Sequence, residues 1–462
     1  MEHKGNRVDG VKIAYIGGGS RGWAWGLMSD LAVEEQMGGT ISLYDIDYSA
    51  AYNNEIIGNR LSGREDIKGK WKYRAVEILE EALKGADFVV ISILPGTFDE
   101  MESDVHLPEK YGIYQAVGDT VGPGGIVRAL RTIPMYAHIA ESIKKYAPEA
   151  WVINYTNPMT LCTRTLYEVF PDIRAFGCCH EVFGTQQLLA DMLKEMKGIE
   201  DVNRREIMVN VLGINHFTWL DKATYQGMDL MPLYGEFADR YYEEGYIVNN
   251  EEHWLNSFFG SADRVKFDLF KRYGIIAAAG DRHLAEFCPP WYLKDPETVK
   301  FWKFGLTPVS WRKEYRTILM EKGRRLAGGE EEFELKNTGE DGILQMKALL
   351  GLGDLITNVN LPNRGQIKGL PLGAVVETNA LFVRDNIITV IAGELPSDVQ
   401  NLVSRHVINQ ETTLKAALTE DKELAFRAFA NDPLMTISIQ DARKLFIEML
   451  RNTREYLPGW NL

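Results

Sequence analysis

The sequence predicts an α/β protein with an N-terminal Rossmann-like dinucleotide-binding domain and a C-terminal α+β domain. Over the first 200 residues, short apolar runs alternate with helix-like segments, the pattern of a parallel sheet covered by helices. A glycine-rich loop separates the first apolar run from the first helix-like segment. Because 462 residues exceed one ordinary core, we expect two domains, residues 1–200 and 201–462.

Composition and charge narrow the class of protein. The chain is 45% hydrophobic and 25% charged, as in globular proteins. A formal net charge of -14 argues against general binding to nucleic acids or anionic membranes. The first ten residues lack the apolar core of a secretory signal, and the four cysteines suggest no disulfide framework. We therefore expect a cytoplasmic protein without nucleic-acid or membrane partners.

The first strand and the loop after it predict a nucleotide site. Val11–Ile16 is apolar, the next six residues (GGGSRG) fit G-x-G-x-x-G, and Trp23–Glu35 is helix-like. The first glycine of the pattern allows a tight turn, the second lets a pyrophosphate approach the backbone, and the third allows close helix packing. The helix N-terminus offers N–H donors to phosphates. The candidate contacts in this loop are Gly17, Gly19, Ser20, Arg21 and Gly22.

An acidic residue at the end of the second strand indicates which nucleotide is bound. Thr40–Asp45 is strand-like and ends in an acid 23 residues after Gly22. We expect Asp45 to accept hydrogen bonds from an adenosine ribose and to repel a 2′-phosphate, which favours NAD over NADP. The alternative is a tight turn beside a surface aspartate.

A long irregular segment is expected after the strand that ends at Ile93. Thr97–Gly125 contains Gly118–Gly125 (GDTVGPGG), which is too rich in turn formers for regular structure. Long loops inside compact domains are usually functional. Asp119 and Thr120 are possible ligand contacts, although a solvated loop tip explains either residue alone.

The stretch Trp151–Gly184 carries the residues that most suggest chemistry. We expect two buried strands, Trp151–Tyr155 and Ile173–Cys178, joined by a helix over Met159–Phe170. The second strand ends at three reactive residues, Cys179, His180 and Glu181. Ligands bind outside the carboxyl ends of the strands in an open parallel sheet, so these residues suggest metal or acid/base chemistry.

Two segments stand out in the second half of the chain. Ile207–Leu212 leads into Gly213–Phe217 (GINHF), before a hairpin expected over Thr218–Gly227. Gly280–Glu286 (GDRHLAE) is expected to be a loop. The remaining expectations are helices over Asp229–Phe270, Gly342–Leu352 and Pro396–Leu450, and turn-rich strands over Asn358–Glu377.

Cys179 and His216 are the candidate metal ligands. The paired spacings of a structural zinc site are absent, and one thiolate with one imidazole leaves open positions for a substrate. The alternatives are that Cys179 is a small buried hydrophobic residue and that His216 is a satisfied core histidine.

These motifs together resemble glycoside hydrolase family 4, the NAD- and manganese-dependent glycosidases. The resemblance covers nearly the whole chain. It rests on IGGGSRG, LYDID, GDTVGPGG, the NP of INYTNP, CCHEV, GINHF and NLPNRGQIKGLPLGAVVE. In this family the tetrapeptide that begins at the metal cysteine follows the substrate, and CHEV is similar to that of the α-galacturonidase subgroup.

The resemblance implies a role for each matching residue. Cys179 and His216 would hold Mn²⁺ or another divalent cation. Asn157 would contact the sugar near the nicotinamide, and His180 stands where the family places its general acid.

The resemblance leaves the general base open. Phosphoglycosidase members use a tyrosine in a loop that corresponds to Gly280–Phe287, and this sequence has none there. Asp281 is the first replacement and His283 the second. In the implied mechanism NAD⁺ oxidises sugar C3, the base removes the C2 proton, the aglycone leaves from C1, and water and NADH complete the cycle.

For a uronic acid, the C6 carboxylate needs a cation or several hydrogen-bond donors. The arginine candidates are Arg128, Arg131 and Arg282, and the other possible substrate contacts are Asp119, Glu181 and His283. The expected function is hydrolysis of short galacturonides by a dimer or tetramer. The alternatives are an α-glucosidase, α-galactosidase or α-glucuronidase of the same family, an ordinary NAD-dependent dehydrogenase, and a non-catalytic dinucleotide sensor.

Overall fold

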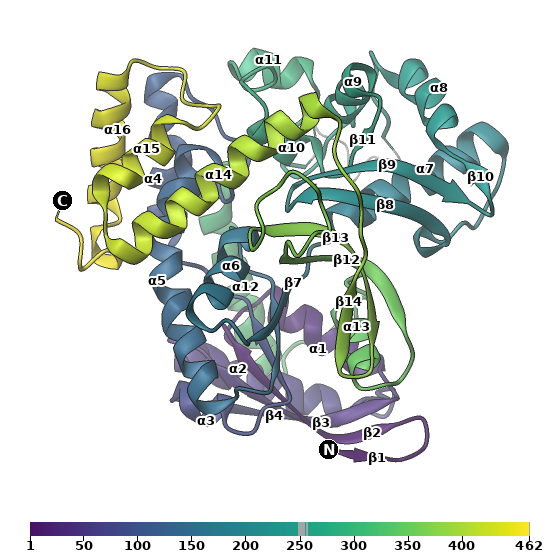
Figure 1. Ribbon diagram of the computed structural model, residues 1–462. Coiled ribbons are helices and arrows are strands. Elements are labelled where there is room, and N and C mark those ends of the chain that lie inside the picture. Colours follow the sequence, from purple (N-terminus) through teal and green to yellow (C-terminus); the bar gives the residue numbers. More distant parts are fainter. Residues whose placement is uncertain (248–254, 256, 462) are drawn as a thin grey trace.

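The computed structural model describes residues 1–247, 255 and 257–461, and a ten-stranded mixed sheet runs through its centre (Figure 1). The strand order is β14-β13-β12-β7-β6-β5-β2-β3-β4, with β1 (Glu2–His3) paired to β2. Six of these strands run parallel: β2 (Val8–Ile16), β3 (Met37–Tyr44), β4 (Lys70–Val76), β5 (Phe88–Ile91), β6 (Trp151–Asn154) and β7 (Arg174–Gly177). The predicted Rossmann-like α/β class is confirmed.

Helices cover both faces of this sheet, so its central strands contain apolar runs. All four residues of β5 are buried. The covering helices in the first part of the chain are α1 (Trp23–Val33), α2 (Tyr48–Ser62), α3 (Leu79–Leu83), α5 (Gly122–Tyr146) and α6 (Met159–Val169). α1 and α6 each lie within two residues of the helices predicted over Trp23–Glu35 and Met159–Phe170.

Three strands from the second half of the chain extend the same sheet. β12 (Leu355–Pro362) pairs antiparallel with β7 and with β13 (Val375–Val383), and β14 (Asn386–Thr389) forms the edge. The approach at β7 is close, since a Cβ on Gly177 would lie 3.0 Å from the Asn360 Cβ. A domain division near residue 200 stays a prediction.

A second, smaller sheet lies beside the first. It contains β8 (Ile207–Ile214), β9 (Phe217–Tyr225), β10 (Met228–Asp229) and β11 (Ile276–Ala277), and α7 (Glu181–Lys197), α8 (Met231–Tyr241) and α9 (Arg264–Tyr273) pack against it. The turn between β8 and β9 is formed by Asn215 and His216, so the GINHF segment is itself a hairpin turn. The segment predicted as a hairpin over Thr218–Gly227 is instead one strand, β9, which forms hairpins with β8 before it and with β10 after it.

Two segments that the sequence predicts to be irregular contain helices. Thr97–Gly125 includes α4 (Phe98–His106), a 3₁₀ turn, and the start of α5. The signals are local: Thr97 and Glu100 form a capping box, and Pro123 occupies the first turn of α5, where proline is tolerated. Likewise Gly280 precedes α10 (Asp281–Phe287), whose apolar face is buried. The loop predictions were wrong because short helices give little periodicity.

The remaining helices are α11 (Pro296–Phe301), α12 (Val309–Gly328), α13 (Gly342–Leu349), α14 (Ser397–Thr419), α15 (Lys422–Ala430) and α16 (Ile439–Asn452). The last three confirm the helical prediction for Pro396–Leu450, and α14 packs along α5 (Figure 1). Within the predicted helical stretch Asp229–Phe270, residues 248–254 and 256 lie outside the described part. Among the described helices none combines the length and apolar character needed to cross a bilayer.

Candidate functional site

The glycine loop after β2 has the shape that a nucleotide phosphate requires. The amides of Gly17 and Gly18 both donate to the Tyr44 carbonyl at 2.9 Å, which folds the loop against β3. Gly17 has φ +93°, and a Cβ there would lie 1.9 Å from the Ser92 carbonyl oxygen, so only glycine fits. A Cβ on Gly18 would lie 2.8 Å from Leu43.

The close approach expected at Gly22 is absent, because a Cβ there would meet nothing within 4 Å. Gly19 is the crowded position instead, 2.7 Å from the Ala50 side chain. Ser20 caps α1, its hydroxyl accepting from the Trp23 amide at 3.2 Å. Arg21 is half-buried, and its charge lowers the pKa of the Asp45 carboxyl less than burial raises it.

Asp45 stands at the end of β3 beside this loop, as predicted. Its two carboxylate oxygens accept from the Gly19 amide and the Asp47 amide, each at 2.9 Å. Asp47 turns to cap α2 through the Ala50 amide. Asp45 therefore lies beside the glycine loop, where the sequence predicts a ribose contact.

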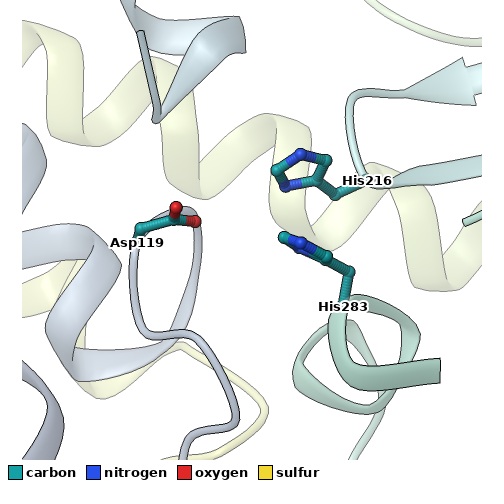
Figure 2. Close-up of side chains that lie close together, drawn as sticks. All are labelled: Asp119, His216 and His283. Atoms are coloured by element: carbon teal, nitrogen blue, oxygen red, sulfur yellow. The ribbon is translucent and has the colours of Figure 1, made fainter. Parts of the chain in front are cut away.

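A second group of polar side chains gathers Asp119, His216 and His283 (Figure 2). One ligand atom of each lies within 4.8 Å of those of the others, and the imidazole centroids are 3.7 Å apart. The three residues come from the loop before α5, the β8–β9 turn and α10. The sequence names all three as candidates but does not predict that they meet.

Hydrogen bonding fixes which nitrogen of His216 carries a proton. The Thr120 hydroxyl donates to Asp119 Oδ1 at 2.7 Å, so at 3.0 Å from His216 Nδ1 it acts as an acceptor. Burial and the neighbouring His283 lower the pKa of His216 to about 3, so this imidazole is neutral at pH 7. A neutral ring with its proton on Nδ1 leaves the Nε2 lone pair free for a metal.

His283 faces the same space and is incompletely bonded. Its Nδ1 is buried without a hydrogen-bond partner in the described structure, and its Nε2 lies 3.6 Å from Glu181 Oε1. Glu181 also accepts from the Gly280 amide, which ties α7 to the start of α10. Burial would raise the pKa of Glu181, but the neighbouring histidines outweigh it and lower the pKa to about 2. Glu181 therefore presents a negative charge to His283.

Asp281 points away from this group although it is only two residues from His283. Its carboxylate oxygens accept from the Val265 amide at 3.2 Å and the Lys266 amide at 3.1 Å, which caps the N-terminus of α9. The side chain is fully buried there. Burial and the charge of Asp263 raise the pKa of Asp281 to about 7.

Cys179 lies at the end of β7 on a buried network that also reaches the His216 turn. The Cys179 carbonyl accepts from the Asn358 side chain at 3.3 Å, and the same amide nitrogen donates to Glu377 at 2.6 Å. The other Glu377 oxygen accepts from Asn215 at 3.2 Å. Burial raises the pKa of Glu377 to about 7, and it also raises the pKa of the Cys179 thiol. No role for Glu377 was predicted from the sequence, although it ends the VVE run of β13.

His180 differs from the two buried histidines. Its side chain is half-exposed, and Nδ1 lies 2.8 Å from Glu340 Oε1. This hydrogen bond raises the pKa of His180 to about 9, so the ring is an imidazolium at pH 7. Glu340 lies between α12 and α13, in a segment anchored to α1 where Thr338 bonds Asp30. No sequence motif points to Glu340.

Asn157 links the predicted sugar contacts to the arginines on α5. Its side-chain amide donates to Asp119 Oδ2 at 3.2 Å, and its carbonyl accepts from Arg128 at 3.1 Å. Burial would raise the pKa of Asp119, but the charges of His216 and Arg128 outweigh the effect of burial and lower the pKa to about 2. Arg131 is committed elsewhere, in a fully buried ion pair with Asp104.

Comparison with known proteins finds similarity over nearly the whole chain. The model of family 4 glycosyl hydrolases matches residues 12–195, and that of the family's C-terminal domain matches residues 211–435. An alpha-galacturonidase from Thermoanaerobacterium saccharolyticum is 67% identical, with 100% of each chain covered. The crystal structure of a Bacillus subtilis protein named as a glucosidase superposes with a TM-score of 0.92 at 56% identity, covering 96% of this chain and 100% of the other.

A more distant crystal structure shares the fold. It is the 6-phospho-beta glucosidase from Thermotoga maritima with manganese, NAD⁺ and glucose-6-phosphate, with a TM-score of 0.76 at 21% identity over 96% of this chain and 99% of the other. Family matches over both parts of the chain, together with full-length relatives, establish that this protein belongs to family 4 of the glycosyl hydrolases.

Proposed function

We propose that this protein is an α-galacturonidase that hydrolyses short galacturonides with NAD and a divalent cation, Mn²⁺ first among them. The observation that carries the proposal is the group of Asp119, His216 and His283, with Glu181 of CHEV 3.6 Å from His283, in a chain 67% identical to an alpha-galacturonidase. The roles of the individual residues are part of this proposal.

The residues fit both groups. The crowded glycines and Asp45 suit NAD, with the ribose at Asp45 and the pyrophosphate at the start of α1. His216 Nε2, the Asp119 carboxylate and the predicted Cys179 thiolate are nitrogen, oxygen and sulfur donors for a divalent cation. When bound, the nicotinamide supplies reversible hydride transfer at C3 and the cation supplies Lewis acidity at the adjacent sugar oxygens.

Of the two candidate bases, His283 has the better position. Its unpartnered Nδ1 lies in the group with Asp119 and His216, whereas both oxygens of Asp281 are used by α9. His283 Nδ1 would take the C2 proton, and Glu181 beside Nε2 would stabilise the imidazolium formed. Asn157 would hold a sugar hydroxyl close to Asp119.

His180 would act as the general acid. Glu340 bonds its Nδ1 and keeps the ring protonated, which leaves Nε2–H to donate to the glycosidic oxygen as the C1 bond breaks. A pKa of about 9 ensures that the acid form dominates at neutral pH.

The test is to hydrolyse digalacturonic acid in D₂O with NAD⁺ and Mn²⁺ and to examine the released sugar by NMR. We expect deuterium at C2, no net NADH, and loss of activity without either NAD⁺ or Mn²⁺. Protium at C2, or full activity after removal of both, would refute the proposal. Accumulating NADH would instead identify an ordinary dehydrogenase.

The Cys179→Ser variant provides the matched test of the metal assignment, since it changes one sulfur to oxygen. We expect weaker Mn²⁺ binding and loss of turnover, and full activity would remove Cys179 from the site. A cytoplasmic location and assembly as a dimer or tetramer stay predictions, to be checked by cell fractionation and light scattering.

A further inference from the structure

The arginines near Asp119 differ in how many of their donors are already used. Arg131 is fully buried and pairs with Asp104. Arg282 donates to the Gly305 and Ala116 carbonyls and to the Thr307 hydroxyl. These two guanidinium groups therefore have structural partners, although the sequence marks both as candidates for a substrate carboxylate.

Arg128 is nearly as enclosed, with 5% of its surface exposed. It donates to the Asn157 carbonyl at 3.1 Å, and its Nη1 is buried without a partner in the described structure. Arg128 therefore keeps one unused donor nitrogen, but almost all of its surface is covered by other parts of the fold.

Arg312, which the sequence did not mark, is different from all three. It lies in the first turns of α12 and is half-buried. Within residues 1–247, 255 and 257–461 its guanidinium forms neither a hydrogen bond nor an ion pair. The guanidinium lies over the Phe259 ring, with Arg312 Cζ 5.8 Å from the ring centroid.

Two observations bring Arg312 near the group of Asp119, His216 and His283. Burial lowers the pKa of Arg312, and the nearby charge of Asp119 partly opposes that shift. Arg282, which precedes His283 on α10, holds its own Cζ 5.2 Å from the same Phe259 ring. The two cations thus converge on one ring from α10 and α12, beside the group of Asp119, His216 and His283.

We propose that Arg312 binds the C6 carboxylate of the uronic acid and so selects uronides over neutral sugars. The inference rests on the proposed function and deepens it. A guanidinium presents parallel N–H donors that match a carboxylate, and such charge-assisted bonds are the strong class of hydrogen bond. A half-buried cation with unused donors has lost part of its hydration, and an anionic ligand restores those hydrogen bonds.

An anionic ligand beside Asp119 needs positive charge to balance that carboxylate, and the Arg312 guanidinium supplies part of it. Asp119 is negative, and Arg282 supplies a second positive charge across the Phe259 ring. Without Arg312, a carboxylate would meet the charge of Asp119 and the cation Arg282, whose donors already have partners. Neutral sugars lack this requirement, so a change at Arg312 affects uronates selectively.

The experiment compares calorimetric binding of D-galacturonate and D-galactose to the protein loaded with NAD⁺ and Mn²⁺. For Arg312→Gln we expect galacturonate affinity to fall by roughly 10- to 150-fold, the range for a hydrogen bond to a charged group, with a much smaller change for galactose. Arg312→Lys keeps the charge but loses the fork, and it should fall between the two.

Arg316→Gln is the control, because Arg316 is exposed one turn further along α12. It should bind both sugars as the unaltered protein does. Equal losses of both sugars in Arg312→Gln, or an unchanged preference for galacturonate, would overturn the inference and leave the proposed function standing. An unaltered protein that prefers galactose, or that hydrolyses no galacturonide, would instead overturn the proposed function and the inference with it.

Discussion

The nucleotide loop and the sugar-side group are built by different means. The loop uses backbone amides and crowded glycines from one short stretch, and Asp45 is its one charged contact. The sugar-side group uses side chains from four elements, with Asp119, Glu181, His216 and His283 brought together across the fold. In the loop, position and chemistry are inseparable, because an added Cβ on Gly17 or Gly18 would collide with neighbouring backbone atoms. In the sugar-side group each side chain has a separable role, so single substitutions should remove one function at a time.

The largest effect should come from the proposed base. His283→Ala should lower kcat by roughly 10²–10⁴-fold, the usual contribution of a general base, and leave Mn²⁺ binding intact. Steady-state kinetics and calorimetric Mn²⁺ titration measure the two effects separately. Loss of Mn²⁺ binding in this variant would make His283 a ligand rather than a base.

On the nucleotide side, Asp45→Ala should weaken NAD⁺ binding by roughly 10- to 150-fold, since bonds to a charged acceptor are lost. Sugar binding should change little. Asp47→Ala is the control, because Asp47 caps α2 and is exposed. Fluorescence titration with NAD⁺ and NADP⁺ checks the result, and equal losses in the two variants would contradict the ribose assignment.

Glu377→Gln tests whether the buried network supports the metal. The substitution keeps the shape of the side chain but alters its hydrogen bonds to Asn215 and Asn358. Asn215 directly precedes His216, and Asn358 donates to the Cys179 carbonyl. Partners that orient metal ligands typically contribute 10- to 100-fold in affinity, and we expect Mn²⁺ binding to weaken by about that much. Unchanged Mn²⁺ affinity would mean that the network serves stability alone.

The smallest effect at neutral pH should come from Glu340→Gln. Glu340 raises the pKa of His180 to about 9, so the acid form persists below that pH and is lost above it. Without the carboxylate the pKa moves toward the ordinary 6.5, and activity should fall about fourfold at pH 7 and more steeply above. The pH–rate profile measures this shift, with Glu334→Gln in the same segment as the control. An unshifted alkaline limb would exclude His180 as the acid.

The two regions also differ in how far sequence alone predicts them. Gly17, Gly19 and Asp45 follow from spacing, because the strand–loop–helix unit is local. The meeting of Asp119 with His216 depends on packing between elements far apart in the chain, which no spacing encodes. Glu340 and Glu377 were missed for the same reason.

The choice between Asp281 and His283 depends on a more specific physical feature. The segment was predicted to be a loop, in which both side chains could reach the sugar. In helix α10, residues two apart point about 200° from each other, since each residue turns 100°. Only one of them can face the site.

The strands that extend the sheet beyond β7 have a consequence for how this protein can be divided. β12 pairs with β7 at Asn360 and Gly177, and Val359 and Phe382 pack into the same core as Ile13 and Tyr15. A fragment cut near residue 200 would keep the glycine loop and Asp45 yet expose an unpaired strand edge at β7 and lose part of an apolar core. The sheet that carries the glycine loop is therefore assembled from two separate stretches of the chain, and β12, β13 and β14 complete it late in the sequence.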